Sequence, residues 1–140
     1  MQTKKSINNL KGTVHHLEIY VSDLEKTIEF WGWFLPELGY ENYQKWDKGI
    51  SYKLLDTYLV FVQTEEKYLD IVYRRKRTGL NHIAFHAESQ SIVDDLINGL
   101  NERKIKLLYE DKHPFSGEKD YYAVFFEDPD RIKVELVAPY

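Results

Sequence analysis

The chain has 140 residues and a formal net charge of −4, and this length fits one domain that can fold without disulfides. It contains no cysteine, which excludes a disulfide scaffold, a cysteine-ligated zinc site and a cysteine nucleophile and suits a cytoplasmic location. The acidic balance does not favour nucleic acid as a partner, and no apolar run reaches the roughly 20 residues that span a bilayer, so no membrane partner is expected.

The first predicted element is a half-buried strand over residues 13–21. Alternation of side chains places His16 and Glu18 on one face, and on the other face His15 with the apolar residues Leu17, Ile19 and Val21. The apolar face should pack beneath a helix. The face of His16 should then lie on the concave side of a sheet, where polar side chains are unusual.

A helix is predicted directly after this strand. Ser22 and Glu25 have the spacing of a capping box, and an apolar stripe continues from there to about residue 34. Pro36 and Gly39 should end the helix. Three short strands separated by tight turns are predicted next, at residues 41–46, 50–55 and 58–63.

The charged segment 64–79 is predicted to be a linker that includes a short strand at residues 69–73. Its basic run, residues 74–77, is expected to be solvated. The alternative is that this run forms a patch for an anionic ligand or partner.

The pattern of the first half repeats after the linker. A strand at 80–87, which carries His82 and His86 on one face, precedes a helix at 91–101 and strands at 105–109, 121–127 and 133–137. Aligning His16 with His82 brings both strands and both helices into register. We therefore predict a single α+β domain of two tandem βαβββ modules, residues 13–63 and 80–138, whose mixed sheets curl into a cup.

Three side chains in this arrangement have metal-ligand chemistry. His16 and His82 occupy matching places on matching strands, and Glu135 lies on the last strand. A carboxylate inside a sheet cup is costly unless it is paired or bound to a metal. Two imidazoles and one carboxylate suit a divalent ion such as Zn, Ni, Mn, Fe or Co, with positions left for water or substrate.

The segments VHHLEIYVSDLEKTIEFW, LNHIAFHA and YYAVFFEDPDRIKVELV resemble the three signature segments of the glyoxalase/bleomycin-resistance/extradiol-dioxygenase (vicinal oxygen chelate) superfamily. The resemblance covers residues 14–138, nearly the whole chain. It implies the glyoxalase-like fold. It also implies that His16, His82 and Glu135 are the metal ligands, because they stand where metal-dependent members carry theirs.

The chain departs from parts of the family pattern. Classical glyoxalase I has a fourth ligand, a glutamate on the last strand of the first module, whereas residues 58–63 offer no acid and Gln63 is the nearest polar residue. This difference argues against a straightforward glyoxalase I. Ring-cleaving members use a further histidine and tyrosine, for which His86 and Tyr122 are the candidates here. Arg131 replaces the glycine that many relatives carry after Asp-Pro-Asp.

The leading functional hypothesis is a metal-dependent enzyme that chelates a small oxygen-bearing substrate, with lyase or isomerase, transferase and dioxygenase chemistry all open. Glu18 is the candidate general base, and Tyr52, His86 and Tyr122 are the candidate substrate-binding residues. The first alternative is a metal-free protein that sequesters an aromatic or drug-like ligand, as bleomycin-binding relatives do. A second alternative is an accessory module with an inactive site. Eleven Tyr, seven Phe and three Trp suit a lined cavity or a homodimer interface, although strands also favour aromatic residues.

Overall fold

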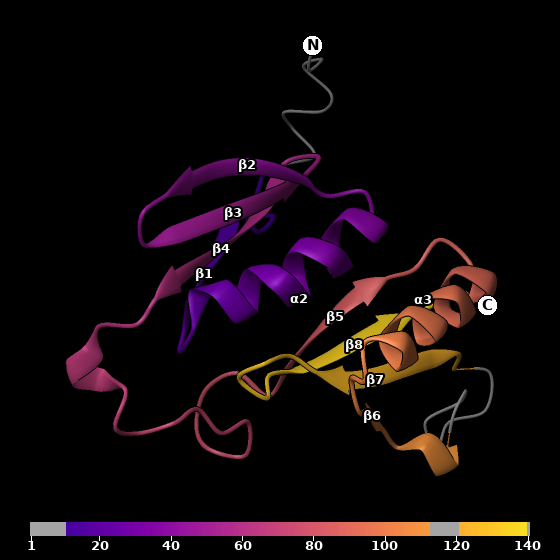
Figure 1. Ribbon diagram of the computed structural model, residues 1–140. Coiled ribbons are helices and arrows are strands. Elements are labelled where there is room, and N and C mark those ends of the chain that lie inside the picture. Colours follow the sequence, from indigo (N-terminus) through magenta and orange to yellow (C-terminus); the bar gives the residue numbers. More distant parts are fainter. Residues whose placement is uncertain (1–10, 113–120, 140) are drawn as a thin grey trace. The chain divides into compact units, whose positions relative to one another are not determined.

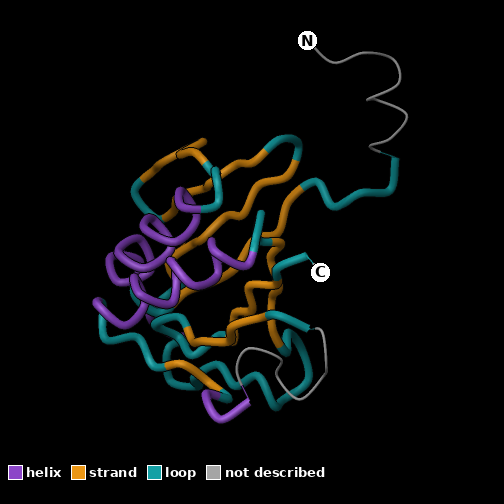
Figure 2. Tube along the Cα trace, turned by 90° about the vertical axis from the view of Figure 1, so that its right-hand side faces the viewer, coloured by secondary structure: helices purple, strands orange, loops and turns teal. Residues whose placement is uncertain are grey.

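The computed structural model describes residues 11–112 and 121–139. The chain forms two compact units, residues 1–68 and 69–140, and each is described here by itself (Figure 1). In each unit one helix lies against one face of a four-stranded sheet (Figure 2). Among the described residues, no helix has the length and apolar character needed to cross a membrane.

The first unit has the predicted βαβββ order. Strand β1 (His16–Val21) is followed by helix α2 (Leu24–Glu37) and by strands β2 (Glu41–Trp46), β3 (Gly49–Leu54) and β4 (Thr57–Gln63). The sheet order is β1-β4-β3-β2, in which β1 runs parallel to β4 and the other neighbours are antiparallel. Each predicted strand of this unit is therefore confirmed, with boundaries that differ by a few residues at most.

The start of α2 differs from the predicted capping box. Asp23, not Ser22, is the N-cap, and its carboxylate accepts a hydrogen bond from the backbone N–H of Lys26 at 3.2 Å. The N–H of Leu24 is bound by Gln63 Oε1 at 2.8 Å, a contact from 39 residues away that local spacing could not reveal. The helix also continues to Glu37, beyond the predicted end at residue 34.

The core of the first unit lies between α2 and one face of its sheet. Trp31 is fully buried, and its ring stacks on that of Phe61 with centroids 5.1 Å apart. Cross-strand register places Leu17, Leu59 and Tyr52 on the same face of the sheet as Phe61. The opposite face, which carries His16, Glu18 and Tyr58, is therefore the face that α2 does not cover.

The second unit repeats this topology. It contains strand β5 (His82–His86), helix α3 (Gln90–Glu102) and strands β6 (Leu107–Leu108), β7 (Ala123–Glu127) and β8 (Lys133–Val137), in the sheet order β5-β8-β7-β6. Here β5 runs parallel to β8, as β1 does to β4. The predicted internal repeat and α+β class are thus confirmed.

Two predictions for the second unit are wrong in detail. Residues 69–73 form turn and coil instead of a strand, after a short 3₁₀ helix at Glu66–Tyr68. Strand β6 has only two residues, whereas residues 105–109 were predicted. Helix α3 covers the face of the sheet that carries Val134 and Leu136, both fully buried, so the face of His82 and Glu135 is again the uncovered one.

Candidate functional site

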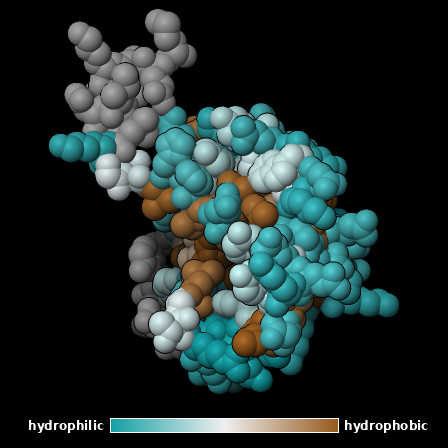
Figure 3. Space-filling view, turned by 90° about the vertical axis from the view of Figure 1, so that its left-hand side faces the viewer, coloured by the Kyte–Doolittle hydropathy of each residue, from teal (hydrophilic) through white to brown (hydrophobic). Residues whose placement is uncertain are grey.

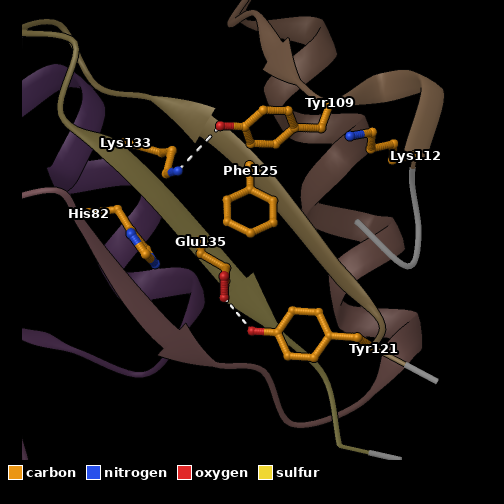
Figure 4. A pocket seen from close by; sticks show the side chains of 7 residues that line it. All are labelled: His82, Tyr109, Lys112, Tyr121, Phe125, Lys133 and Glu135. Atoms are coloured by element: carbon orange, nitrogen blue, oxygen red, sulfur yellow. Dashed lines mark hydrogen bonds between the residues drawn. The ribbon is translucent and has the colours of Figure 1, made fainter. Parts of the chain in front are cut away.

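A pocket of about 450 Å³ lies on the uncovered face of the second unit's sheet. Its volume is in the range of small-molecule sites. Strands β5, β7 and β8 supply His82, Phe125, Lys133 and Glu135, while residues outside the strands complete the lining with Tyr109, Lys112 and Tyr121 (Figure 4). The pocket therefore brings together two of the three predicted metal ligands, His82 and Glu135.

His82 is oriented by the residue before it. Its Nδ1 lies 2.7 Å from the side-chain oxygen of Asn81. Because an amide oxygen only accepts hydrogen bonds, this contact places the proton on Nδ1 and leaves the lone pair of Nε2 available. Metal-ligating histidines in proteins are commonly held in this way, through a hydrogen bond from the other ring nitrogen.

Glu135 is a buried carboxylate with one hydrogen bond on one of its oxygens. Its exposed fraction is 4%, and the hydroxyl of Tyr121 donates a hydrogen bond of 2.5 Å to its Oε1. Among the described residues, no cation lies within ion-pairing distance of this carboxylate. A buried carboxylate with so little compensation is costly unless a cation binds it, so the donor set of His82 Nε2 and Glu135 Oε2 fits a divalent metal.

Aromatic rings and an ammonium group form another part of the pocket. Lys133 Nζ lies 3.3 Å from the hydroxyl of Tyr109. It also lies 5.3 Å and 5.4 Å from the ring centroids of Tyr109 and Phe125, within cation–π range. Neither Lys133 nor Tyr109 was singled out from the sequence as a site residue; the only available signal was that Lys133 shares the strand face of Glu135.

His16 and Glu18 lie on β1 of the first unit, exposed on the face that α2 does not cover. The ring of His16 stacks on that of Tyr58, with centroids 4.8 Å apart and an interplanar angle of 4°. His15 was predicted to point to the opposite face, but its Nδ1 lies 2.9 Å from Nδ1 of His16. The strand begins at His16, so its alternation of faces does not extend to His15.

Two of the candidate substrate-binding residues, Tyr122 and Tyr52, are not among the residues that line the pocket. Tyr122 donates a hydrogen bond of 2.6 Å to Asp94 on α3, and this bond, together with burial and the charge of Asp94, raises the pKa of Tyr122 above its ordinary value. Tyr121, its neighbour, points to Glu135 instead. Tyr52 is 2% exposed and lies beneath α2, with its hydroxyl oxygen 3.0 Å from where a Cβ on Gly32 would stand.

His86, the remaining candidate, closes β5 on the same strand face as His82 but does not line the pocket. Gln63 is the polar residue nearest to the position where classical glyoxalase I has its fourth ligand. In this structure its side chain forms hydrogen bonds within the first unit. Besides binding the N–H of Leu24, its amide donates to the backbone oxygens of Ser22 at 2.9 Å and Thr64 at 3.2 Å. Gln63 is therefore a cap for α2.

The basic linker is held against the second sheet at one position. Arg75 Nη1 lies 2.9 Å from Glu127 Oε2, and Arg131 Nε lies 3.1 Å from the same oxygen. The side chains of Arg75 and Glu127 are only 19% and 15% exposed. Arg75 is therefore largely buried, whereas the whole basic run was predicted to be solvated. Arg131 adopts φ +66°, in the left-handed region that favours glycine.

Within either unit, the described residues hold no cluster of three His, Asp or Glu side chains that could bind a metal. The predicted set takes His16 from the first unit and His82 and Glu135 from the second.

This chain is similar to an uncharacterized bacterial protein and to solved structures of glyoxalase-type proteins. The chain is 59% identical over 126 residues to the uncharacterized protein YqjT of Bacillus subtilis, a match that covers 90% of this chain and 98% of YqjT. A crystal structure of a candidate glyoxalase from Bacillus halodurans is 58% identical with a TM-score of 0.92, covering 94% of this chain and 98% of that one. A glyoxylase/bleomycin resistance protein/dioxygenase domain from Frankia sp. EAN1pec, at 20% identity, has a TM-score of 0.70 and coverage of 92% and 93%. No family model matches the sequence.

Proposed function

The chain belongs to the glyoxalase/bleomycin-resistance/dioxygenase superfamily, and from this membership we propose that it is a divalent-metal-dependent enzyme acting on a small oxygen-bearing substrate. The observation that carries the proposal is the pairing of His82 and Glu135 in one pocket, each oriented by a neighbour and each with one donor atom left. The reaction class, whether lyase or isomerase, transferase or dioxygenase, is left to substrate screening.

The proposed ligands are His82 Nε2, Glu135 and His16. When bound, a divalent ion would supply Lewis-acid stabilisation of negative charge on substrate oxygens. Tyr121 orients the carboxylate of Glu135 through its hydrogen bond, and Asn81 fixes the tautomer of His82. Glu18, exposed two residues along the strand from His16, is the proposed general base.

We expect protein purified without a chelating column to contain about one divalent ion per chain, measured by plasma mass spectrometry. His16→Ala and His82→Ala should each reduce this content, since either change leaves two ligands that compete poorly with water for the ion. Full metal content in both variants would contradict the ligand set.

The competing function is a metal-free binding protein for an aromatic ligand. The observation that favours it is the aromatic lining of the pocket by Tyr109, Tyr121 and Phe125. A wild-type chain that stays metal-free in the presence of Zn, Ni, Mn, Fe and Co salts, and that binds aromatic compounds, would support this function over the enzyme.

We also propose that the protein is a homodimer. The surface carries exposed apolar side chains among hydrophilic ones (Figure 3). Ile71 and Val72 are among the most exposed, at 73% and 70%, and exposed apolar surface is typical of association sites. Light scattering should therefore give about twice the chain mass of 16.7 kDa, and a monomer at high concentration would refute the dimer.

A further inference from the structure

Lys133 carries a charge that no carboxylate in the described part of the chain neutralises. The side chain is half-buried, and the contacts of its ammonium group are one hydroxyl, that of Tyr109, and the faces of two rings (Figure 4). No carboxylate among the described residues lies within ion-pairing distance of its Nζ. Withdrawing an ammonium group from water without a counter-ion is unfavourable, and cation–π contacts offset only part of that cost.

The two acids nearest to Lys133 in the sheet form no ion pair with it. Glu127 is its cross-strand partner on β7, but the Oε2 atom of Glu127 is shared by Arg75 and Arg131. Glu135 lies two residues along β8 on the same face, and its Oε1 accepts the hydrogen bond of Tyr121. Arg75 thus comes from the linker to take the carboxylate that would otherwise pair with Lys133.

A second ammonium group reaches the same pocket. Lys112 lies in the short 3₁₀ helix Glu110–Lys112 and also lines the pocket without an ion pair among the described residues. Among the described residues that line the pocket, two lysines against one carboxylate leave an excess of positive charge in a space of about 450 Å³. A divalent ion held by Glu135 would increase that excess. A neutral substrate would leave this charge uncompensated, whereas an anionic substrate would neutralise it.

We propose that Lys133, Tyr109 and Lys112 form an oxyanion subsite, so that the substrate of this pocket carries a carboxylate or phosphonate group that binds at Lys133. The inference rests on the proposed function, because it names the substrate class of the same site. Lys133 Nζ supplies a point charge with two N–H groups not used by Tyr109, and charge-assisted hydrogen bonds to an oxyanion are the strong ones. The rings of Tyr109 and Phe125 would contact the apolar part of the substrate.

Binding of simple probes tests this subsite without any knowledge of the reaction. Chelator-treated, metal-free full-length protein is titrated with benzoate, phenylphosphonate and the uncharged benzamide, and ¹H–¹⁵N NMR shifts give the dissociation constants. We expect at least one anion to bind and benzamide to bind at least about 10-fold more weakly, as the loss of a charge-assisted hydrogen bond implies. The tighter of the two anions identifies a planar or a tetrahedral oxyanion.

Variants separate the charge of Lys133 from its packing. Lys133→Met keeps the apolar stem over the rings and should weaken anion binding about 10-fold or more, whereas Lys133→Arg should retain it. Lys67→Met is the matched control, because Lys67 also lies over a ring, that of Tyr68 at 5.1 Å, but does not line the pocket. Lys67→Met should bind the anions as the wild type does.

The inference is overturned if benzamide binds as tightly as the anions, if no probe binds, or if Lys133→Met binds anions as well as the wild type does. Metal content is measured separately on every variant, and we expect Lys133→Met to retain wild-type metal content. If the wild-type protein contains no metal as purified and takes up none from added divalent salts, but binds anions through Lys133, the proposed metal dependence is refuted and the subsite stands. If the wild-type protein contains metal but its anion binding does not depend on Lys133, the subsite alone is refuted. Circular dichroism excludes misfolding, and Lys133→Gln gives a second variant without the charge if Lys133→Met does not fold.

Discussion

Replacing Glu135 with glutamine is expected to lower metal affinity by more than about 100-fold, because even the loss of an outer hydrogen-bond partner of a ligand commonly costs about 10–100-fold. The amide is nearly isosteric with the carboxylate and can still accept the hydrogen bond of Tyr121, so the fold should survive. What is removed is the negative charge at a position that is 4% exposed. Isothermal titration of the chelator-treated variant with Zn²⁺ or Ni²⁺ measures the loss.

Two further substitutions show whether the effect belongs to Glu135 as a ligand. Glu18→Gln should leave metal affinity within about two-fold of wild type and lower turnover instead, since a general base contributes about 10²–10⁴-fold to a rate. Tyr121→Phe removes only the hydrogen bond to Oε1 and should cost about 10–100-fold in metal affinity. Full loading of Glu135→Gln would remove Glu135 from the ligand set, and unchanged turnover in Glu18→Gln would make that residue a surface carboxylate.

The second large effect concerns stability. Trp31→Ala should lower the free energy of unfolding by about 3–5 kcal/mol, the usual cost of truncating a fully buried aromatic side chain. Trp31 has no exposed surface and stacks on Phe61, and it makes edge contacts with Phe30 and Phe34 at 5.2 Å and 5.9 Å. Its loss leaves a cavity between α2 and the sheet. Urea denaturation followed by circular dichroism measures the change.

Trp33→Ala is the control for Trp31→Ala. Trp33 lies on the same helix two residues away and is only half-buried, with its ring centroid 6.3 Å from that of Phe34. Its truncation should cost only about 1 kcal/mol, because less apolar surface is withdrawn from water there. Equal losses in the two variants would show that α2 does not pack on the sheet through Trp31.

The repeated topology of this protein was predictable from the sequence, because it is recorded in local patterns. Strands Glu41–Trp46 and Lys133–Val137 begin and end at their predicted residues, and α3 differs from its prediction by one residue at each end. Alternation and helical periodicity need only neighbouring residues to be read. The same alternation correctly placed His82 and Glu135 on one uncovered face.

Local propensity was not sufficient where pairing partners decide. Residues 69–73, apolar except for Asp70, favour a strand, yet they form none, because a strand needs a neighbour to satisfy its backbone N–H and C=O groups. The cap of α2 also depends on a distant residue, Gln63, whose side chain binds Leu24. The residues of the segment 69–73 and of the Gln63 cap are visible in the sequence, but local patterns do not show which residues pair with them in the fold.

The candidate site shows the same division. The sequence by itself determined that His82 faces inward on its strand and that Lys133 and Glu135 share one face of the last strand. Only the tertiary structure decided that Tyr121 and not Tyr122 reaches Glu135, because both tyrosines precede Ala123, where the strand and its alternation begin. It also decided that Lys133 does not pair with Glu127, its cross-strand neighbour, since Arg75, 52 residues from Glu127 along the chain, binds that carboxylate. Charge pairing over such distances depends on the folded path of the chain, which no local pattern encodes.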